Sequence, residues 1–190
     1  QFMKIFFYKY GSICEPDISD SFRRLGFEVI DEDMEIYNKN LLPSQCVETV
    51  SKKLIDGQFT FVFTINFFPW LSDLCEIMHL KYISLIVDSP VLELYSYSLK
   101  NDCNRIFLFD RCLYNEFEPF NQGHIFHVPL AADVNRIQNV IKNASTSEKA
   151  KFASDISFIG STYQEKCPFN RSELNDADRG FTDGIIEAQL

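Results

Sequence analysis

The segment Phe59-Thr60-Phe61-Val62-Phe63-Thr64-Ile65 decides the fold class. It is short and rich in β-branched and aromatic residues, which is typical of a strand buried on both faces. Pro69 then opens a segment with helical spacing, and a second apolar run follows at residues 82–87. A strand, a helix and a strand in succession predict parallel pairing through a right-handed crossover.

The same alternation continues on both sides of this segment. Each apolar run is short, and helix-like spacing or a turn separates it from the next. The sequence therefore predicts an α/β fold, an open and mostly parallel Rossmann-like three-layer sandwich. The expected strands are 4–8, 27–30, 59–65, 82–87, 105–109 and 124–128, and the expected helices are 19–25, 44–55, 69–78 and 112–117.

The character of the chain changes after residue 132. Residues 1–132 are expected to form the Rossmann-like domain, and the polar residues 133–154 a connector with a weak helix at 134–141. A new strand and loop are expected at 155–161, followed by helical sequence at 169–190. Residues 155–190 are thus expected to be the truncated start of a second domain, or a helix that packs back on the first.

Composition excludes several classes of partner. The 190 residues contain 18 Lys and Arg against 27 Asp and Glu, a net charge of −9, which argues against nucleic-acid binding. No run approaches the ~20 apolar residues of a membrane span. The six cysteines form no C-x-x-C pair and are expected to be reduced thiols, which predicts a cytoplasmic location.

Candidate site residues follow from the rule that ligands bind beyond the carboxyl ends of parallel strands. Asp88 is the candidate catalytic carboxylate, although a turn or capping role is equally compatible with its position. The pair Asp110-Arg111 has the same two interpretations. The predicted substrate-binding residues are Gly11, Ser12, Asn66, Asp88, Ser89, Asp110 and Arg111.

Other ligand classes have weaker support. Asp31 lies about 20 residues after Gly11, where a dinucleotide-binding acid is expected, but Gly11 is the only glycine of that loop. Phe67, Phe68 and Trp70 follow a strand and could stack on a sugar, whereas the Phe residues within the strand are expected to be core. His124 and His127 point to opposite faces of a strand, so no metal site is expected from them.

Four blocks carry a resemblance to a known family: DSP at 88–90, NRIFLFDR at 104–111, HVPLAA at 127–132 and DISFIGSTY at 155–163. In order and spacing they resemble CgeB-like, spore-maturation-type bacterial glycosyltransferases. The resemblance implies a GT-B architecture, with Asp88, Asp110 and Arg111 on the acceptor side. It places Gly160 and Ser161 in the first glycine loop of the donor side.

The resemblance also implies a function. It implies a nucleotide-sugar donor, a sugar acceptor, and no permanently bound cofactor or metal. Because the chain ends at Leu190, it is expected to be an acceptor-side half that is inactive without its missing C-terminal domain. The alternative is a non-catalytic Rossmann-like binding or regulatory module that recognises a protein partner through its acidic surface. A nicotinamide-dependent reductase is a third, weaker hypothesis.

Overall fold

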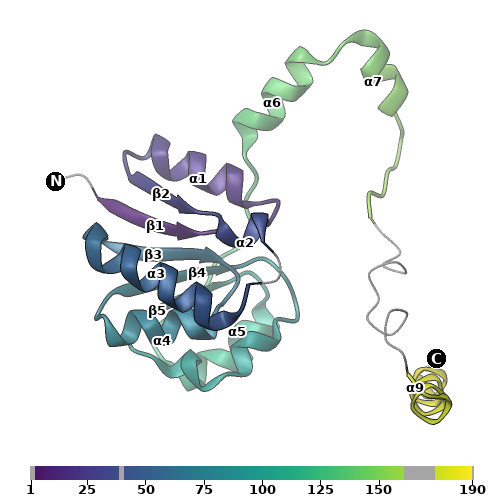
Figure 1. Ribbon diagram of the computed structural model, residues 1–190. Helices are drawn as coiled ribbons and strands as arrows, with labels where there is room; N and C mark the ends of the chain where they lie inside the picture. Colours follow the sequence, from purple (N-terminus) through teal and green to yellow (C-terminus); the bar gives the residue numbers. More distant parts are fainter. Residues whose placement is uncertain (1–2, 39–40, 161–173, 190) are drawn as a thin grey trace. The chain divides into compact units, whose positions relative to one another are not determined.

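Six parallel strands form one open sheet in the computed structural model, which describes residues 3–38, 41–160 and 174–189 (Figure 1). Every neighbouring pair of strands is parallel. The predicted α/β class, an open Rossmann-like three-layer sheet, is therefore confirmed. The strands are β1 (Lys4–Tyr8), β2 (Glu28–Glu32), β3 (Phe61–Ile65), β4 (Lys81–Ile86), β5 (Asn104–Leu108) and β6 (Ile125–His127).

The strand order is β2-β1-β3-β4-β5-β6. From β1 the chain moves outward to β2, and it then returns to the other side of β1 to begin β3. The direction of winding reverses between β1 and β3, so their carboxyl ends form the topological switch point of the sheet. The order is that of flavodoxin-type sheets with one added strand, and differs from the 3-2-1-4-5-6 order of dinucleotide-binding folds.

One face of the sheet carries the larger hydrophobic core. Fully buried Phe6, Val62 and Ile106 project from its strands, and Leu71 and Phe117 pack on them from helices. This core is covered by α3 (Pro43–Gly57), α4 (Pro69–Ile77), the short 3-10 helices η1 (Leu92–Tyr95) and η2 (Tyr97–Lys100), and α5 (Arg111–Phe117).

On the opposite face, α1 (Glu15–Arg24) covers the part of the sheet formed by β2, β1 and β3. Phe22 of this helix packs edge-on against Phe63 with ring centroids 5.0 Å apart, and Phe63 packs in the same way on Phe7. Phe61 and Phe63 are buried, so the alternating phenylalanines of the decisive segment are core, as predicted.

Several element boundaries differ from the prediction by one or more residues, and two of these differences have a clear physical reason. Strand β2 extends through Asp31 and Glu32, which were expected to lie in a loop. They stay in an edge strand because cations neutralise both: Asp31 pairs with Lys9 and Glu32 with Lys53. Helix α1 starts at Glu15 rather than near Ser19, because Pro16 suits a first turn and Glu15 and Asp17 favour the positive end of the helix dipole.

Two short elements complete the first compact unit of the chain, Gln1–Arg136: α2 (Met34–Tyr37) and η3 (Glu118–Phe120). The first turn of α6 (Val134–Asn143) belongs to the same unit. It is tied to α1 by an ion pair of 2.8 Å between Arg136 and Asp17 and one of 3.0 Å between Asp133 and Arg24.

The second unit, Ile137–Leu190, contains helices and irregular segments where the structure describes it. It holds the rest of α6, α7 (Thr146–Phe152) and α9 (Asp176–Gln189). Residues 155–160 form no strand, so the predicted strand there is wrong; the loop residue Ser161 lies outside the described residues. Among the helices described, none has the length and apolar character needed to cross a membrane.

Candidate functional site

Glu15 closes the loop between β1 and α1. Its carboxylate is 2% exposed and accepts hydrogen bonds from the backbone N–H groups of Tyr10, at 2.8 Å, and Gly11, at 3.1 and 3.2 Å. Gly11 has a φ of 100°, which only glycine adopts without strain. In doubly wound folds the N–H groups of this loop and helix bind phosphate. Here the chain's own carboxylate fills that position.

Asn66 joins three strands at the switch point. Its side-chain oxygen accepts from the Val87 N–H at 3.1 Å, and its amide donates to the Tyr10 hydroxyl at 2.9 Å and to the Asp88 carboxylate at 2.5 Å. Its φ of 57° lies in the left-handed region, which asparagine tolerates better than most residues. The carboxyl ends of β1, β3 and β4 are therefore held together by one side chain.

Asp110 continues this edge after β5. One carboxylate oxygen accepts the N–H groups of Cys112 and Leu113, at 2.7 and 3.3 Å, and so caps α5. The other accepts the Ser89 hydroxyl at 2.9 Å. The Ser89 hydroxyl and then these two N–H groups hold the pKa of Asp110 below its usual range. We call the group formed by Tyr10, Gly11, Asn66, Asp88, Ser89 and Asp110 the switch-point edge.

The structure unites most of the predicted substrate-binding residues. Gly11, Asn66, Asp88, Ser89 and Asp110 belong to the switch-point edge, and the Ser12 hydroxyl accepts from the Cys14 N–H at 3.4 Å within the same loop. Arg111 begins α5 and is exposed. Gly160 is exposed in the other compact unit, and Ser161 lies outside the described residues.

Two members of this region were not predicted from the sequence, Tyr10 and Glu15. Glu15 could have been found from the Glu-Pro-Asp sequence at 15–17, which signals a helix start directly after the loop. No sequence signal marks Tyr10 as the partner of Asn66, because the two lie 56 residues apart and only strand pairing brings them together.

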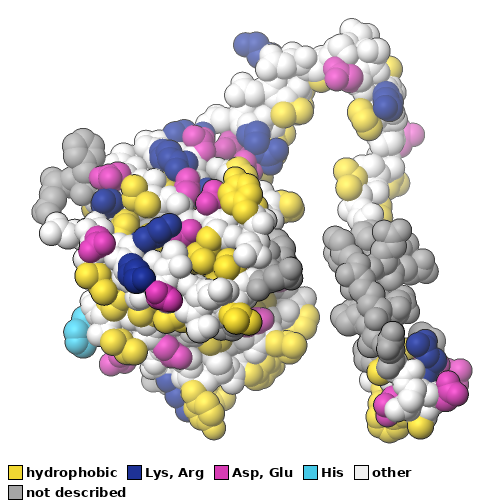
Figure 2. Space-filling model, viewed as in Figure 1, with side chains coloured by type: hydrophobic (Ala, Val, Ile, Leu, Met, Phe, Trp, Pro, Cys, Tyr) yellow, Lys and Arg dark blue, Asp and Glu magenta, His cyan; other side chains and the backbone are white. Residues whose placement is uncertain are grey.

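Asp31, the residue at the spacing of a dinucleotide-binding acid, is already engaged. Its carboxylate forms ion pairs with Lys9 at 2.8 Å and with Arg23 at 2.5 Å, and it accepts a hydrogen bond from the Ser19 hydroxyl at 3.1 Å. Partial burial raises its pKa, but the hydrogen bonds from Lys9 and Arg23 outweigh that effect, and the net shift is downward. Figure 2 shows basic and acidic side chains intermixed over this part of the unit.

The aromatic residues after β3 belong to the core. Phe67 is 1% exposed, and Phe68 and Trp70 both pack edge-on against the buried Tyr8, with centroids 5.4 and 5.3 Å away. Phe68 and Trp70 are half-buried and pack against the larger hydrophobic core. Their placement favours the core interpretation over the sugar-stacking one.

His124 and His127 form hydrogen bonds within the fold. His124 Nδ1 lies 2.8 Å from the Asn121 side-chain oxygen, and His127 Nε2 lies 3.2 Å from the Phe109 carbonyl oxygen. Within residues 3–38, 41–160 and 174–189, no three His, Cys, Asp or Glu side chains gather so that they could hold a metal ion.

Comparison with known proteins assigns no family to this chain. No family model matches the chain, and no curated protein matches it. A solved structure, a response regulator receiver protein from Sinorhizobium medicae WSM419, is similar over 75% of this chain and 93% of its own length. The two are 7% identical, and the TM-score is 0.39.

The predicted membership of the CgeB-like glycosyltransferases is therefore wrong. No family model supports it, and the similar solved structure described above is a receiver protein rather than a glycosyltransferase. The resemblance also implied the GT-B architecture, the acceptor-side function and the nucleotide-sugar donor, and these expectations are withdrawn with it. The blocks at 88–90 and 104–111 misled because an apolar strand that ends in Asp and a turn or capping residue is common to parallel α/β sheets in general.

Proposed function

We propose that this chain is a non-catalytic binding module that recognises basic side chains of a protein partner at the switch-point edge. The observation that carries the proposal is the Glu15 carboxylate on the N–H groups of Tyr10 and Gly11. These donors are used internally, so the loop does not offer them to a phosphate or another anion. The charged groups left at the edge are the carboxylates of Asp88 and Asp110.

The charge of these carboxylates favours a cationic ligand. Asp88 is exposed and Asp110 is half-buried. In the described part of the chain, neither forms an ion pair with a lysine or arginine. A guanidinium group matches carboxylate geometry and forms charge-assisted hydrogen bonds with it. The net charge of −9 adds a field that attracts a basic partner.

The positions of the two carboxylates are fixed before any ligand arrives. Asn66 holds Asp88, and both Ser89 and the α5 N-terminus hold Asp110. Fixed side chains lose little conformational freedom on binding, which favours recognition. The lowered pKa of Asp110 keeps it ionised at neutral pH.

The hydrogen-bond partners of the histidines support a binding role rather than a catalytic one. General acid–base chemistry needs a titrating group within reach of a nucleophile or substrate proton. His124 and His127 contact an asparagine and a backbone carbonyl instead.

Isothermal titration calorimetry with an (Arg-Gly)4 peptide at low salt tests the proposal, with (Ser-Gly)4 as the uncharged control. The wild type should bind only the basic peptide, and added NaCl should weaken the binding. The double variant Asp88→Asn/Asp110→Asn keeps the side-chain shapes and the helix cap. It should bind the basic peptide about three- to tenfold more weakly, because two exposed charge pairs are lost.

A matched double variant, Asp56→Asn/Glu93→Gln, removes the same charge from exposed positions elsewhere. It should bind like the wild type apart from a small loss of long-range attraction. Equal weakening in both double variants would show that net charge alone binds the peptide. Binding of (Ser-Gly)4 as tight as that of (Arg-Gly)4 would contradict the proposal.

A further inference from the structure

A second concave site lies between the connection that joins β4 to β5 and the connection that joins β5 to β6. It is a pocket of about 240 Å³ formed by η1, η2, α5 and η3, and it shares no residue with the switch-point edge. Four aromatic side chains line it, together with two leucines, Ser96 and Lys100. The aromatic residues are Tyr95, Tyr97, Phe117 and Phe120.

The wall of this pocket is built by specific contacts. The Tyr95 hydroxyl donates to a Glu116 carboxylate oxygen at 2.7 Å, which joins η1 to α5. The Tyr95 ring packs edge-on against Phe117, with centroids 4.9 Å apart. Phe117 is 2% exposed and forms the inner wall, so the Tyr95 ring is held in place on a rigid support.

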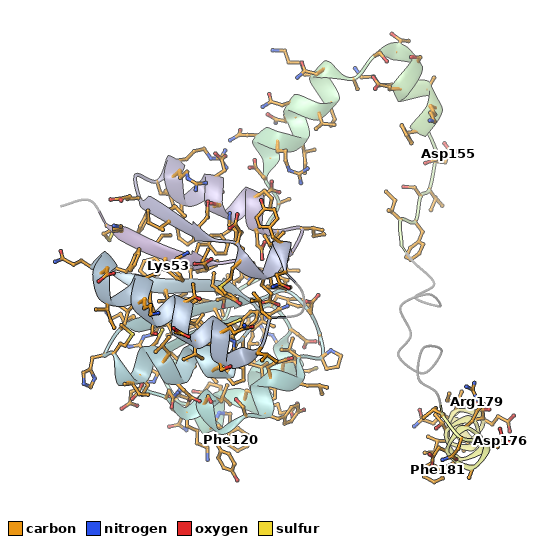
Figure 3. All side chains as sticks on the ribbon, in the orientation of Figure 1. Lys53, Phe120, Asp155, Asp176, Arg179 and Phe181 are labelled. Atoms are coloured by element: carbon orange, nitrogen blue, oxygen red, sulfur yellow. The ribbon has the colours of Figure 1, made fainter. Side chains whose placement is uncertain are left out.

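The rim is apolar and accessible. Tyr97 is 92% exposed and Phe120 is 56% exposed. Figure 3 shows Phe120 at the lower end of the sheet unit, where Figure 2 shows hydrophobic side chains at the surface. Large aromatic groups at the rim of a pocket bind flat rings well, because they bury much area with little loss of side-chain entropy.

Two polar side chains, Ser96 and Lys100, line the pocket beside the aromatic rings. The Ser96 hydroxyl oxygen is buried without a hydrogen-bond partner among the residues described, and it does not cap η2. Buried hydroxyls almost always have a partner, so an unsatisfied one in a pocket wall points to a group that the pocket receives. The Lys100 ammonium is exposed and forms no ion pair within the described part of the chain.

We infer that this pocket binds a small aromatic carboxylate. The ring of the ligand would lie among Tyr95, Tyr97 and Phe120. The carboxylate of the ligand would form an ion pair with Lys100 and accept a hydrogen bond from the Ser96 hydroxyl. The volume is below the roughly 300–1,000 Å³ of pockets for drug-sized ligands, which limits the occupant to one ring or one fused ring system. This site is independent of the proposed recognition of basic groups.

Titration of the ¹⁵N-labelled chain with indole-3-acetate, followed by amide chemical shifts, tests the inference. Shifts should concentrate at residues 94–100 and 117–120. The uncharged analogue 3-methylindole should bind more weakly, because it lacks the carboxylate. Lys100→Gln should weaken indole-3-acetate binding about two- to fivefold, and Phe120→Ala about two- to tenfold.

Ser96→Ala separates a binding role from a structural one. It removes the unsatisfied hydroxyl, so it should weaken indole-3-acetate binding without lowering the unfolding temperature. Lys52→Gln removes an exposed lysine of α3 and serves as the matched charge control, with unchanged affinity expected. The inference is overturned if millimolar indole-3-acetate shifts no residue of the pocket, if 3-methylindole binds equally well, or if Lys52→Gln weakens binding as much as Lys100→Gln.

Discussion

Glu15 accepts the backbone N–H of Gly11 at 3.1 and 3.2 Å, and by this contact the chain occupies its own anion-binding loop. The same carboxylate accepts the Tyr10 N–H at 2.8 Å. A loop of this kind, between the first strand and first helix of a doubly wound sheet, ordinarily presents free donors to phosphate. The contact therefore satisfies two donors of the loop that would otherwise be open to an anion.

Removal of the Glu15 carboxylate should create an anion site. Glu15→Ala leaves two loop N–H groups without a partner, so the free energy of unfolding should fall by about 1–3 kcal/mol. Phosphate should then stabilise the variant more than it stabilises the wild type, by about 1.4 kcal/mol near ten times its Kd. Urea unfolding with and without phosphate at constant ionic strength measures both effects.

Glu15→Gln is the control for this experiment, because its amide oxygen still accepts the two N–H groups. It should lose less stability than Glu15→Ala and show no extra response to phosphate. If phosphate stabilised the wild type and Glu15→Ala equally, the loop would not be closed by Glu15.

Tyr82 supplies a buried polar link between β3, β4 and the start of α4. Its hydroxyl lies 2.7 Å from the Thr64 hydroxyl and accepts the Phe68 N–H at 3.0 Å. Tyr82→Phe should lower the free energy of unfolding by about 1–3 kcal/mol, because Phe68 and Thr64 lose this partner. Chemical denaturation measures it. Tyr97→Phe, at an exposed position, should change stability by less than about 0.5 kcal/mol.

Stability should decline at alkaline pH. Burial raises the pKa of the Tyr82 phenol well above its usual value, and burial, followed by a hydrogen bond with Glu76, raises the pKa of the Cys103 thiol to about 12. In the unfolded chain these groups lose their protons near pH 10 and 8.5. The folded chain therefore keeps protons that the unfolded chain releases, and stability that is complete below those values is lost as pH rises.

Urea midpoints measured between pH 7.5 and 11 under reducing conditions check this expectation. The midpoint should fall progressively above about pH 8.5, and the Tyr82→Phe variant should show a shallower fall above pH 10. A midpoint that stayed constant up to pH 11 would show that these groups titrate alike in both states.

His79 offers a stabilising substitution. It follows the end of α4, has a φ of 52° and is exposed. Glycine adopts this left-handed conformation without strain, and it is the preferred residue at this position after a helix. His79→Gly should raise the free energy of unfolding by roughly 0.5–1 kcal/mol. His79→Ala, which keeps a Cβ, should give no such gain in thermal unfolding.

The sheet could be predicted from the sequence because its signal is local. Most strands contain a short apolar run that a polar or turn residue ends, as at Ile65-Asn66. β2 was harder to delimit, because Asp31 and Glu32 resemble a loop until their partners Lys9, Arg23 and Lys53 are known. Two of those partners lie on other segments brought near only by folding.

The second unit shows the opposite difficulty. The run Ile156 to Ile159 has the composition of a strand, yet these residues form none. A strand needs a neighbour to satisfy its backbone, and composition does not supply one. The start of α7 could have been found, because Ser145 and Glu148 form a capping box in which each side chain accepts the other's backbone N–H.

The candidate site was predicted in part. Asn66, Asp88 and Asp110 were found because strand ends converge in a parallel sheet, and the structure joins them through two hydrogen bonds, from Asn66 to Asp88 and from Ser89 to Asp110. The chemistry could not be predicted, because it depends on where Glu15 points. That a carboxylate fills the loop instead of leaving it open is a property of packing rather than of residue spacing.

Amide chemical-shift mapping of the ¹⁵N-labelled chain with (Arg-Gly)4 tests the central claim most directly, since it locates binding on the molecule. We predict shifts at Gly11, Asn66, Asp88 and Ser89 that grow with peptide concentration and that need about three- to tenfold more peptide in Asp88→Asn/Asp110→Asn. Shifts confined to other surfaces, or an edge that responds to inorganic phosphate and not to the basic peptide, would contradict the account.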